Sequence, residues 1–345
     1  MKKKQEAATM TEQFGTLPGG EQVKLYTISK GGITAKITDY GATLVSLWVP
    51  DAKGETADVV LGYDSYEGYE QGDAFFGATV GRNANRIGGA SFLLNGQTVT
   101  VAANENGNNL HSGPDCYNTR LWRVERHAES GITLCLHSPH LDQGFPGNAD
   151  IRVTYTVTEN ALTVSYDAVC DRDTVFNMTN HNYFNLAGQD KQHLAMEQTL
   201  MLSARFFNPD DAANIPTGEL RPVAGTPMDF GSPKPLGQDI GADYEPLKLQ
   251  GGYDHNFEVY TNPCAVLCDP HSGRTMQVHT DCPGIQVYTA NFTDDIGKGG
   301  IRYRPRCAVA LETQFYPDSV NHPEWRQPFV KAGQHYRSTT EYRFL

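Results

Sequence analysis

The 345-residue sequence predicts an all-β fold, a large single-domain β-sandwich. Helical periodicity is nearly absent, while short runs of β-branched and aromatic residues bounded by turn residues recur along the whole chain. The 34 glycines and 19 prolines are spread fairly evenly, so turns are frequent but no stretch has the composition of a linker. Strands this numerous need barrel closure or stacked sheets to protect their edges. We expect stacked sheets with a concave face that offers a cleft.

Three hairpins are visible in the pattern. The clearest joins two runs of alternating apolar and polar residues through the turn pair Glu159-Asn160. A second has Asn95-Gly96 between its arms, which is the strongest short hairpin signal in a sequence. The predicted arms are residues 151–158 with 161–168, residues 90–94 with 97–101, and residues 264–268 with 274–279.

We predict one domain over residues 21–345, preceded by a flexible tail of residues 1–20. The only basic run, Lys2 to Lys4, is not followed by the apolar stretch of a secretion signal. No segment approaches the ~18 continuous apolar residues of a membrane span. Seven cysteines without a framework spacing are typical of free thiols in a reducing compartment. These features predict a cytoplasmic protein with no membrane partner.

The net charge of −12 and the pI near 5.3 restrict the partners of the protein. An acidic field repels nucleic acid and anionic lipid, so neither is expected to bind. A neutral small molecule is the expected ligand. The sequence leaves open whether the chain is a monomer or a homodimer.

Five polar clusters interrupt the apolar strands, and their chemistry suits a polyhydroxylated ring. Amide and guanidinium groups form hydrogen bonds with vicinal hydroxyls, while aromatic faces pack against the C–H surface of a sugar. The same groups also brace loops and cap corners, which is the structural alternative for each cluster. The clusters are residues 81–87, 108–113, 177–186, 251–257 and 308–315.

The last cluster contains a single carboxylate, Glu312, inside an otherwise apolar strand. Strand interiors rarely hold a lone glutamate unless it is paired or used. A buried and unpaired carboxylate has a raised pKa, which suits proton abstraction near neutral pH. Glu312 is therefore a candidate general base.

In their order along the chain, these motifs resemble the galactose mutarotase (aldose 1-epimerase) family, and the likeness runs from about Val23 to the C-terminus. Ser112 and Asn83 depart from the residues usual in the family, but neither is a proposed catalytic group. The matching patterns are Gly-Arg-x-Ala-Asn-Arg-Ile at 81–87, Asn-x-Leu-His-Gly-Gly near 109–113, Asn-His-x-Tyr-Phe-Asn-Leu at 180–186, Tyr-Asp-His-Asn-Phe at 253–257, Pro-Gly-Ile-Gln-Val-Tyr at 283–288 and Leu-Glu-Thr-Gln-x-x-Pro-Asp at 311–318.

The resemblance implies an enzyme that interconverts the α and β anomers of a free hexose such as galactose or glucose. It also implies a single-domain β-supersandwich that needs no cofactor and no metal. Carried over residue by residue, it implies that Glu312 is the general base and His181 the general acid. The residues that it implies for binding the sugar hydroxyls are Asn85, Arg86, His111, Asp254 and Gln286.

The chemistry of mutarotation agrees with an acid and a base. One proton must leave the anomeric hydroxyl and another must reach the ring oxygen, so that the ring opens to an aldehyde. A glutamate with an ordinary pKa of ~4.3 is ionised at pH 7, and we expect the nearby carboxylate to keep the histidine, with its ordinary pKa of ~6.5, protonated. After rotation about the C1–C2 bond the roles reverse and the ring recloses on its other face.

Two metal-dependent alternatives remain open. One is a cupin-like enzyme that would use His111, His181 and Glu312. The other is a zinc site around the third hairpin, although the spacing there matches no recognised zinc pattern. Its ligands would come from Cys264, Cys268, His271, His279 and Cys282.

Two alternatives without a metal also remain. A carbohydrate-binding module would use the same amide and aromatic groups, but it has little use for a pair such as Glu312 and His181. A phosphosugar epimerase would gather several cations around the phosphate, whereas only Arg82 and Arg86 are near the motifs. The chain has neither a Gly-x-Gly-x-x-Gly pattern nor a P-loop, so a nucleotide cofactor is not expected.

Overall fold

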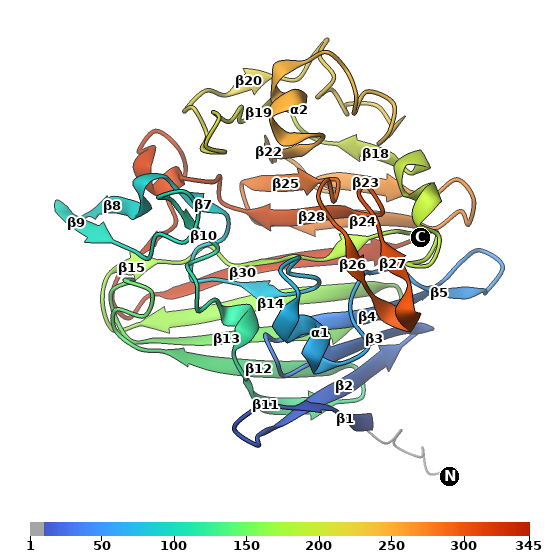
Figure 1. Cartoon of the computed structure of the whole chain (residues 1–345), viewed down its shortest axis with the longest axis horizontal. Coiled ribbons are helices and arrows are strands. Elements are labelled where there is room, and N and C mark those ends of the chain that lie inside the picture. Colours follow the sequence, from blue (N-terminus) through green and yellow to red (C-terminus); the bar gives the residue numbers. More distant parts are fainter. Residues whose placement is uncertain (1–9) are drawn as a thin grey trace.

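The computed structural model describes residues 10–345, and three antiparallel sheets organise them (Figure 1). The nine-stranded sheet contains, in spatial order, β11 (Arg123–Ala128), β12 (Gly131–Ser138), β13 (Ala149–Val157), β14 (Ala161–Cys170), β30 (His335–Phe344), β24 (Thr275–Thr280), β23 (Ala265–Cys268), β18 (Thr199–Leu202) and β21 (Lys234–Pro235). The six-stranded sheet contains β17 (Tyr183–Phe184), β28 (Val309–Gln314), β25 (Gly284–Tyr288), β22 (Asp254–Glu258), β19 (Phe206–Phe207) and β20 (Arg221–Pro222). The five-stranded sheet contains β1 (Met10–Thr16), β2 (Gln22–Lys30), β3 (Ile33–Thr38), β4 (Thr43–Pro50) and β5 (Thr56–Asp58).

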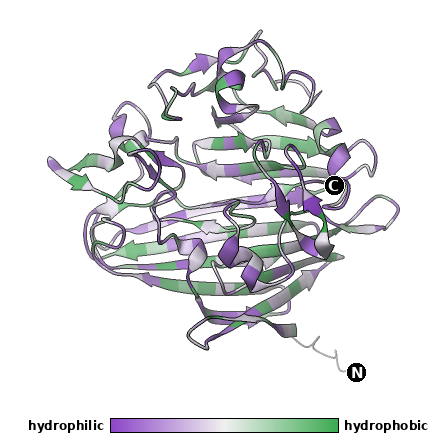
Figure 2. Cartoon of the chain, in the orientation of Figure 1, coloured by the Kyte–Doolittle hydropathy of each residue, from purple (hydrophilic) through white to green (hydrophobic). Residues whose placement is uncertain are grey.

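Alternating residues explain why the long strands stack as they do. Along β13 and β14 every second side chain is buried and the others face outward, which matches the period of a strand with one covered face. Figure 2 shows hydrophilic and hydrophobic residues alternating along these strands. The buried face of β12, β13 and β14 packs against β2 and β3, so the five-stranded sheet covers the nine-stranded one.

The six-stranded sheet shares the same core. The rings of Phe184 on β17 and Tyr342 on β30 lie 4.9 Å apart. The hydroxyls of Thr313 on β28 and Thr340 on β30 are hydrogen-bonded to each other. One continuous apolar cluster, which includes Tyr26 and Phe344, runs through all three sheets. The architecture is therefore the β-sandwich predicted from the sequence.

The three predicted hairpins are confirmed. β13 pairs with β14, and β23 pairs with β24. The third hairpin pairs β8 (Ser91–Leu94) with β9 (Gln97–Thr100) through Asn95 and Gly96, whose φ angles are 52° and 78°. Positive φ at both turn residues is the geometry that Asn-Gly favours, because it matches the twist of the flanking strands.

The predicted tail is wrong for part of its length. Residues 1–9 lie outside the described residues, but Met10–Thr16 form β1, which pairs with β2 at the edge of the five-stranded sheet. Only Phe14 of this strand is buried, so the segment lacks the apolar alternation from which a strand is predicted.

Short ribbons and two helices surround the sheets. The helices are α1 (Tyr66–Gln71) and α2 (Glu245–Gln250). The other ribbons pair β6 (Thr79–Val80) with β16 (Thr179–Asn180), β7 (Arg86–Ile87) with β10 (Asn109–Leu110), β15 (Thr174–Val175) with β29 (Phe329–Val330), and β26 (Asp295–Ile296) with β27 (Arg302–Tyr303). No helix within residues 10–345 has the length and apolar character needed to cross a membrane.

Candidate active site

A cavity of about 620 Å³ lies over the six-stranded sheet. Four neighbouring strands of that sheet, β17, β28, β25 and β22, each contribute a lining side chain. The walls come from the β7–β10 ribbon, from α2 and from two loops, residues 73–75 and 292–294. Six of the seven predicted site residues line the cavity: Asn85, Arg86, His111, His181, Asp254 and Glu312.

Gln286, the seventh predicted residue, is not among the described residues that line the cavity. It lies on β25 directly opposite Glu312 on β28, and opposite residues on antiparallel strands share one face of a sheet. Its Nε2 donates to Oδ1 of Asp254 at 2.7 Å. Gln286 therefore acts on the cavity through Asp254.

His181 and Glu312 meet at the floor of the cavity. The Nε2 of His181 is 3.5 Å from Oε1 of Glu312, and their side chains are 9% and 3% exposed. The His181 ring stacks on Tyr183, with 4.9 Å between the centroids. Within residues 10–345, His181 Nδ1 and Glu312 Oε2 have no hydrogen-bond partner. An unsatisfied buried polar atom costs about 1–3 kcal/mol, so the protein itself does not complete the hydrogen bonding of this pair.

Phe75 is a cavity residue that the sequence patterns did not reveal. Its ring centroid is 4.8 Å from that of His111 and 6.0 Å from that of His181. Its φ of 56° lies in the left-handed region, where a bulky side chain is strained. Strain of this kind is concentrated at functional sites. Nothing local distinguishes Phe75 from Phe76, which is buried in the core.

Arg86 lines the cavity wall and forms an ion pair with Glu105. The Arg86 Nε is 2.5 Å from Oε2 of Glu105, and a second bond joins NH2 to Oε1 at 2.8 Å. A bidentate pair of this kind fixes the guanidinium plane. Glu105 was not predicted, because a loop glutamate 19 residues away carries no signal of its partner.

His111 is a neutral hydrogen-bond donor. The backbone N–H of Asn85 donates to Nδ1 of His111 at 3.1 Å, so the proton of the neutral ring lies on Nε2. Burial lowers the pKa of His111 well below its ordinary value, and the charges of His181 and Arg86 lower it further. The ring can therefore donate to a hydroxyl oxygen without carrying a charge.

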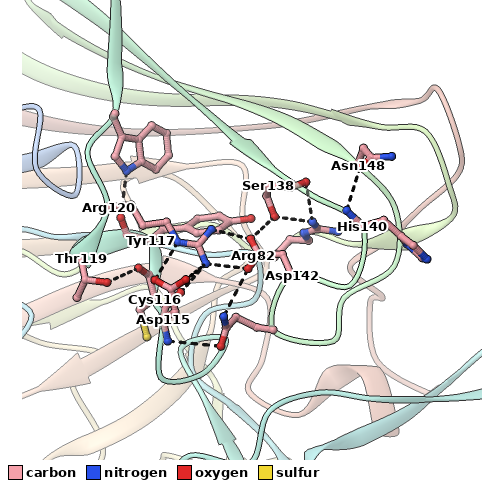
Figure 3. A network of polar contacts seen from close by, with 12 residues as sticks. Arg82, Asp115, Cys116, Tyr117, Thr119, Arg120, Ser138, His140, Asp142 and Asn148 are labelled. Carbon is pink, nitrogen blue, oxygen red and sulfur yellow. Dashed lines mark hydrogen bonds and ion pairs between the residues drawn. The ribbon is translucent and has the colours of Figure 1, made fainter. Parts of the chain in front are cut away.

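Arg82 belongs to the same motif as the cavity arginine but turns away from it. Its guanidinium donates to the hydroxyl of Ser138 at 2.6 Å (Figure 3). It also donates to the carbonyl oxygen of Pro146 at 2.8 Å. Ser138 in turn donates to Asp142, which accepts two bonds from Arg120. Arg82 is a buried brace between loops, and of the two arginines in this motif only the second lines the cavity.

The cysteines and histidines around the third hairpin do not converge on a common point. His271 is 2.8 Å from a carboxylate oxygen of Glu197, and the thiol of Cys264 bonds to the carbonyl oxygen of Val278. Over residues 10–345, no three side chains of His, Cys, Asp or Glu form a group that could hold a metal ion. Both metal-dependent alternatives therefore lack a ligand set in the described part of the chain.

The sequence matches the family model of aldose 1-epimerase over residues 24–343. The chain belongs to the aldose 1-epimerase family. It is 38% identical over 336 residues to the aldose 1-epimerase of Haemophilus influenzae, with 95% of this chain and 97% of the relative covered. It is 37% identical over 338 residues to the galactose mutarotase of Homo sapiens, with 96% and 97% covered. Among solved structures, the aldose epimerase homologue from C. elegans superposes with a TM-score of 0.86 at 33% identity, covering 93% of this chain and 98% of that chain.

Membership of the aldose 1-epimerase family confirms the resemblance and fixes the reaction. The protein is an enzyme that interconverts the α and β anomers of an aldose. The fold is that of the galactose mutarotases, since the galactose 1-epimerase of Lactobacillus acidophilus also superposes with a TM-score of 0.85 at 25% identity, with 98% of each chain covered.

Burial shifts the pKa values of both Glu312 and His181. Removal from water raises the pKa of Glu312 well above its ordinary value, and Asp254 raises it further while Arg86 opposes the shift. Burial also lowers the pKa of His181 to about 4. Both shifts oppose the expected ionised Glu312 beside a protonated His181, because a low dielectric favours the uncharged forms. Burial therefore favours the arrangement in which a proton shared by the two groups lies on Glu312 rather than on His181.

Proposed function

We propose that the enzyme opens and recloses the ring of a free hexose, with galactose and glucose as substrates, through acid–base catalysis by Glu312 and His181. The observation that carries the proposal is the 3.5 Å distance between the two groups at the floor of the cavity. A cavity of about 620 Å³ is within the range of ~300–1,000 Å³ that small-molecule sites occupy.

In the ring-opening step, Glu312 removes the proton of the anomeric hydroxyl while His181 delivers a proton to the ring oxygen. The electrons of the O–H bond form the carbonyl at C1, and the bond between C1 and the ring oxygen breaks. This step uses the form of the pair in which the shared proton is on His181. It leaves Glu312 protonated and His181 neutral, which is the arrangement that burial favours. Desolvation therefore lowers the energy of the open-chain state relative to the closed-ring state that has the proton on His181.

Reclosure reverses the transfers. Rotation about the C1–C2 bond presents the other face of the aldehyde to the C5 hydroxyl. His181 then takes the proton of that hydroxyl while Glu312 returns its proton to the carbonyl oxygen. Protons and electrons balance over the cycle, so the reaction itself requires neither a redox cofactor nor a metal.

The remaining predicted residues are assigned to the sugar hydroxyls. Arg86 and His111 supply donors, Asp254 supplies an acceptor, and Asn85 can supply both. Gln286 holds Asp254 in place through the 2.7 Å bond to Oδ1. Donors and acceptors on opposite walls suit a ring whose hydroxyls point in several directions.

The charge of the cavity supports an uncharged sugar. The single arginine among the described lining residues is already paired with Glu105. Carboxylates around the cavity repel a phosphate group, which disfavours the phosphosugar alternative. The acidic side chains that line it are Asp73, Glu105, Asp254, Asp294, Asp295 and Glu312.

Polarimetry of freshly dissolved α-galactose and α-glucose, with and without the purified protein, tests the proposal. We expect the optical rotation to reach equilibrium faster with the protein present, and little acceleration with glucose 6-phosphate. A module that only binds sugar would leave the rate unchanged. A phosphosugar epimerase would show the reverse preference.

We also propose a reducing, cytoplasmic location, because all seven cysteines are free thiols. The protein is proposed to be a monomer or a homodimer, which sedimentation velocity distinguishes. Labelling of the thiols in intact cells tests the location, and disulfide-linked cysteines would contradict it.

A further inference from the structure

Gln250 lines the cavity but has no role in the mechanism above. It is the last residue of α2, which ends at Gly251 with a φ of 65°, the left-handed conformation that glycine adopts at a helix C-terminus. Only 3% of Gln250 is exposed. Because the Gln250 side chain is almost fully buried and yet lines the cavity, only a small part of it faces the cavity.

Both ends of Gln250 are held. Its backbone carbonyl oxygen accepts a bond from Nδ2 of Asn291 at 3.0 Å. Its side-chain Nε2 donates to Oδ2 of Asp210 at 3.1 Å. Asn291 also donates to the carbonyl oxygen of Tyr253 at 3.1 Å, which ties the end of α2 to the start of β22. These bonds fix which end of the amide faces Asp210.

The free end of the amide is its oxygen. One of the two Nε2 hydrogens of Gln250 is bonded to Asp210, while no donor within residues 10–345 bonds to Oε1, which is therefore the acceptor that the amide can offer to a ligand. An amide oxygen only accepts hydrogen bonds, so its complement is a hydroxyl hydrogen. Burial, helped by the charge of Asp254 and opposed by that of Arg86, raises the pKa of Asp210 to about 8. Asp210 offers an acceptor oxygen to Nε2 in either protonation state.

We propose that Gln250 is a specificity-determining contact, whose Oε1 accepts a hydrogen bond from one hydroxyl of the sugar, and that Asp210 is the positioning residue that orients the amide. The inference rests on the proposed function, because it places an aldose in this cavity. Gln250 comes from the wall of the cavity, whereas Glu312 and His181 form its floor, so the contacted hydroxyl is not one that reacts. The contact is therefore made equally before and during ring opening.

Gln250→Met tests the contact, because methionine keeps the length of the side chain and removes the acceptor. A neutral hydrogen bond made equally in both states changes KM and not kcat, so we expect KM to rise roughly 3- to 10-fold with kcat near wild type. Lys248→Met is the matched control on the same helix, since Lys248 is exposed and pairs only with the exposed Asp243. We expect a wild-type KM from this control.

Two variants of Asp210 test the positioning role. Asp210→Leu removes the partner of Nε2 and frees the amide to turn, so we expect KM to rise without a fall in kcat. Asp210→Asn keeps an acceptor oxygen, so we expect it to restore most of the affinity that leucine loses. An asparagine variant as impaired as the leucine variant would contradict the positioning role.

Hexoses that each lack one different hydroxyl identify the contact. With the hexose that lacks the contacted hydroxyl, wild type and Gln250→Met should show the same KM, because the hydrogen bond to Gln250 is already absent. With the other hexoses, the KM of Gln250→Met should exceed that of wild type by the full factor. An unchanged KM in Gln250→Met, or the same ratio for every sugar, would overturn the inference. If the proposed function is wrong, the wild-type protein will not accelerate mutarotation. In that case the affinities of wild type and Gln250→Met for these sugars are compared by calorimetry instead of their KM values.

Discussion

Two buried polar clusters of this protein differ in how completely their hydrogen bonds are made. In the Arg82 network, NH1 and NH2 make three bonds each, and only Nε has no partner among the described residues. In the cavity, His181 Nδ1 and Glu312 Oε2 have no partner within residues 10–345. The two clusters are therefore similarly buried but differ in what they do. A nearly satisfied cluster holds loops in place, while an incomplete one is suited to a ligand.

The same contrast applies to the electrostatics of the two clusters. Asp142 accepts bonds from Arg120 and Ser138, and these lower its pKa although burial, the largest single influence, raises it. Glu312 has no arginine or hydroxyl donor among the described residues, only His181 at 3.5 Å, and burial raises its pKa well above the ordinary value. A buried carboxylate without a strong cationic partner is therefore available for proton transfer, whereas one that is paired with an arginine is structural.

The largest expected effect is on the rate, in the incomplete cluster. Glu312→Gln keeps the shape of the side chain but cannot accept a proton, so kcat should fall ~10²–10⁴-fold while sugar affinity largely survives. His181→Asn should behave likewise. Because both groups act in one transition state, the double variant should lose less than the product of the two single losses. Polarimetry measures the rates and calorimetry the affinity, and a wild-type rate in Glu312→Gln would move the search for the base to Asp254.

In the nearly satisfied cluster the expected effect is on stability. Arg82→Leu leaves the oxygens of Ser138 and Pro146 without their donor, and each unsatisfied group costs about 1–3 kcal/mol. We expect a loss of roughly 3 kcal/mol or more in the free energy of unfolding, measured by denaturant titration. The folded fraction should keep a kcat close to that of wild type. If Arg82→Leu had a wild-type free energy of unfolding but a much lower kcat, Arg82 would not have the structural role that separates the two clusters.

Smaller losses are expected at the cavity wall. Arg86→Ala and Asp254→Ala each remove charge-assisted bonds to hydroxyls, which are worth ~1.5–3 kcal/mol per bond. Both kcat/KM and sugar affinity should fall by the corresponding factor, and the unfolding free energy should change less than in Arg82→Leu. Saturation curves like those of wild type for both variants would show that these residues do not face the substrate.

Removal of metal ions is expected to have no effect on the mutarotation rate. Because acid–base transfer between Glu312 and His181 balances over the cycle, activity should survive exhaustive dialysis against a chelator. The measurement is the polarimetric rate before and after dialysis. Loss of activity that zinc or another metal restores would overturn the cofactor-free mechanism.

Local patterns were sufficient to predict the hairpins, whereas the predicted residues of the floor and wall came from the resemblance to the aldose 1-epimerase family. Strand alternation and the Asn95-Gly96 turn depend on neighbours in the sequence, so they could be recognised without coordinates. Phe75 and Glu105 could not be predicted, because their roles come from contacts with residues distant in the chain.

The opposite orientations of the two arginines in one motif were equally hidden. Arg82 and Arg86 have the same chemistry, and their roles differ only because loops from elsewhere supply acceptors to the first. The pKa shifts of Glu312 and His181 were hidden for a related reason. Reference pKa values describe groups in water, whereas the sheet removes Glu312 and His181 from it.

The pH dependence of kcat/KM, compared between wild type and Glu312→Gln, tests the central claim that Glu312 and His181 share one proton. The wild-type profile should be bell-shaped. Activity falls below about pH 4, where His181 takes a second proton, and falls again on the alkaline side, where Glu312 loses the only one. Glu312→Gln should keep the acid limb and lose the alkaline limb. An alkaline limb near ~6.5, the ordinary histidine value, or one that persists in Glu312→Gln, would contradict the account.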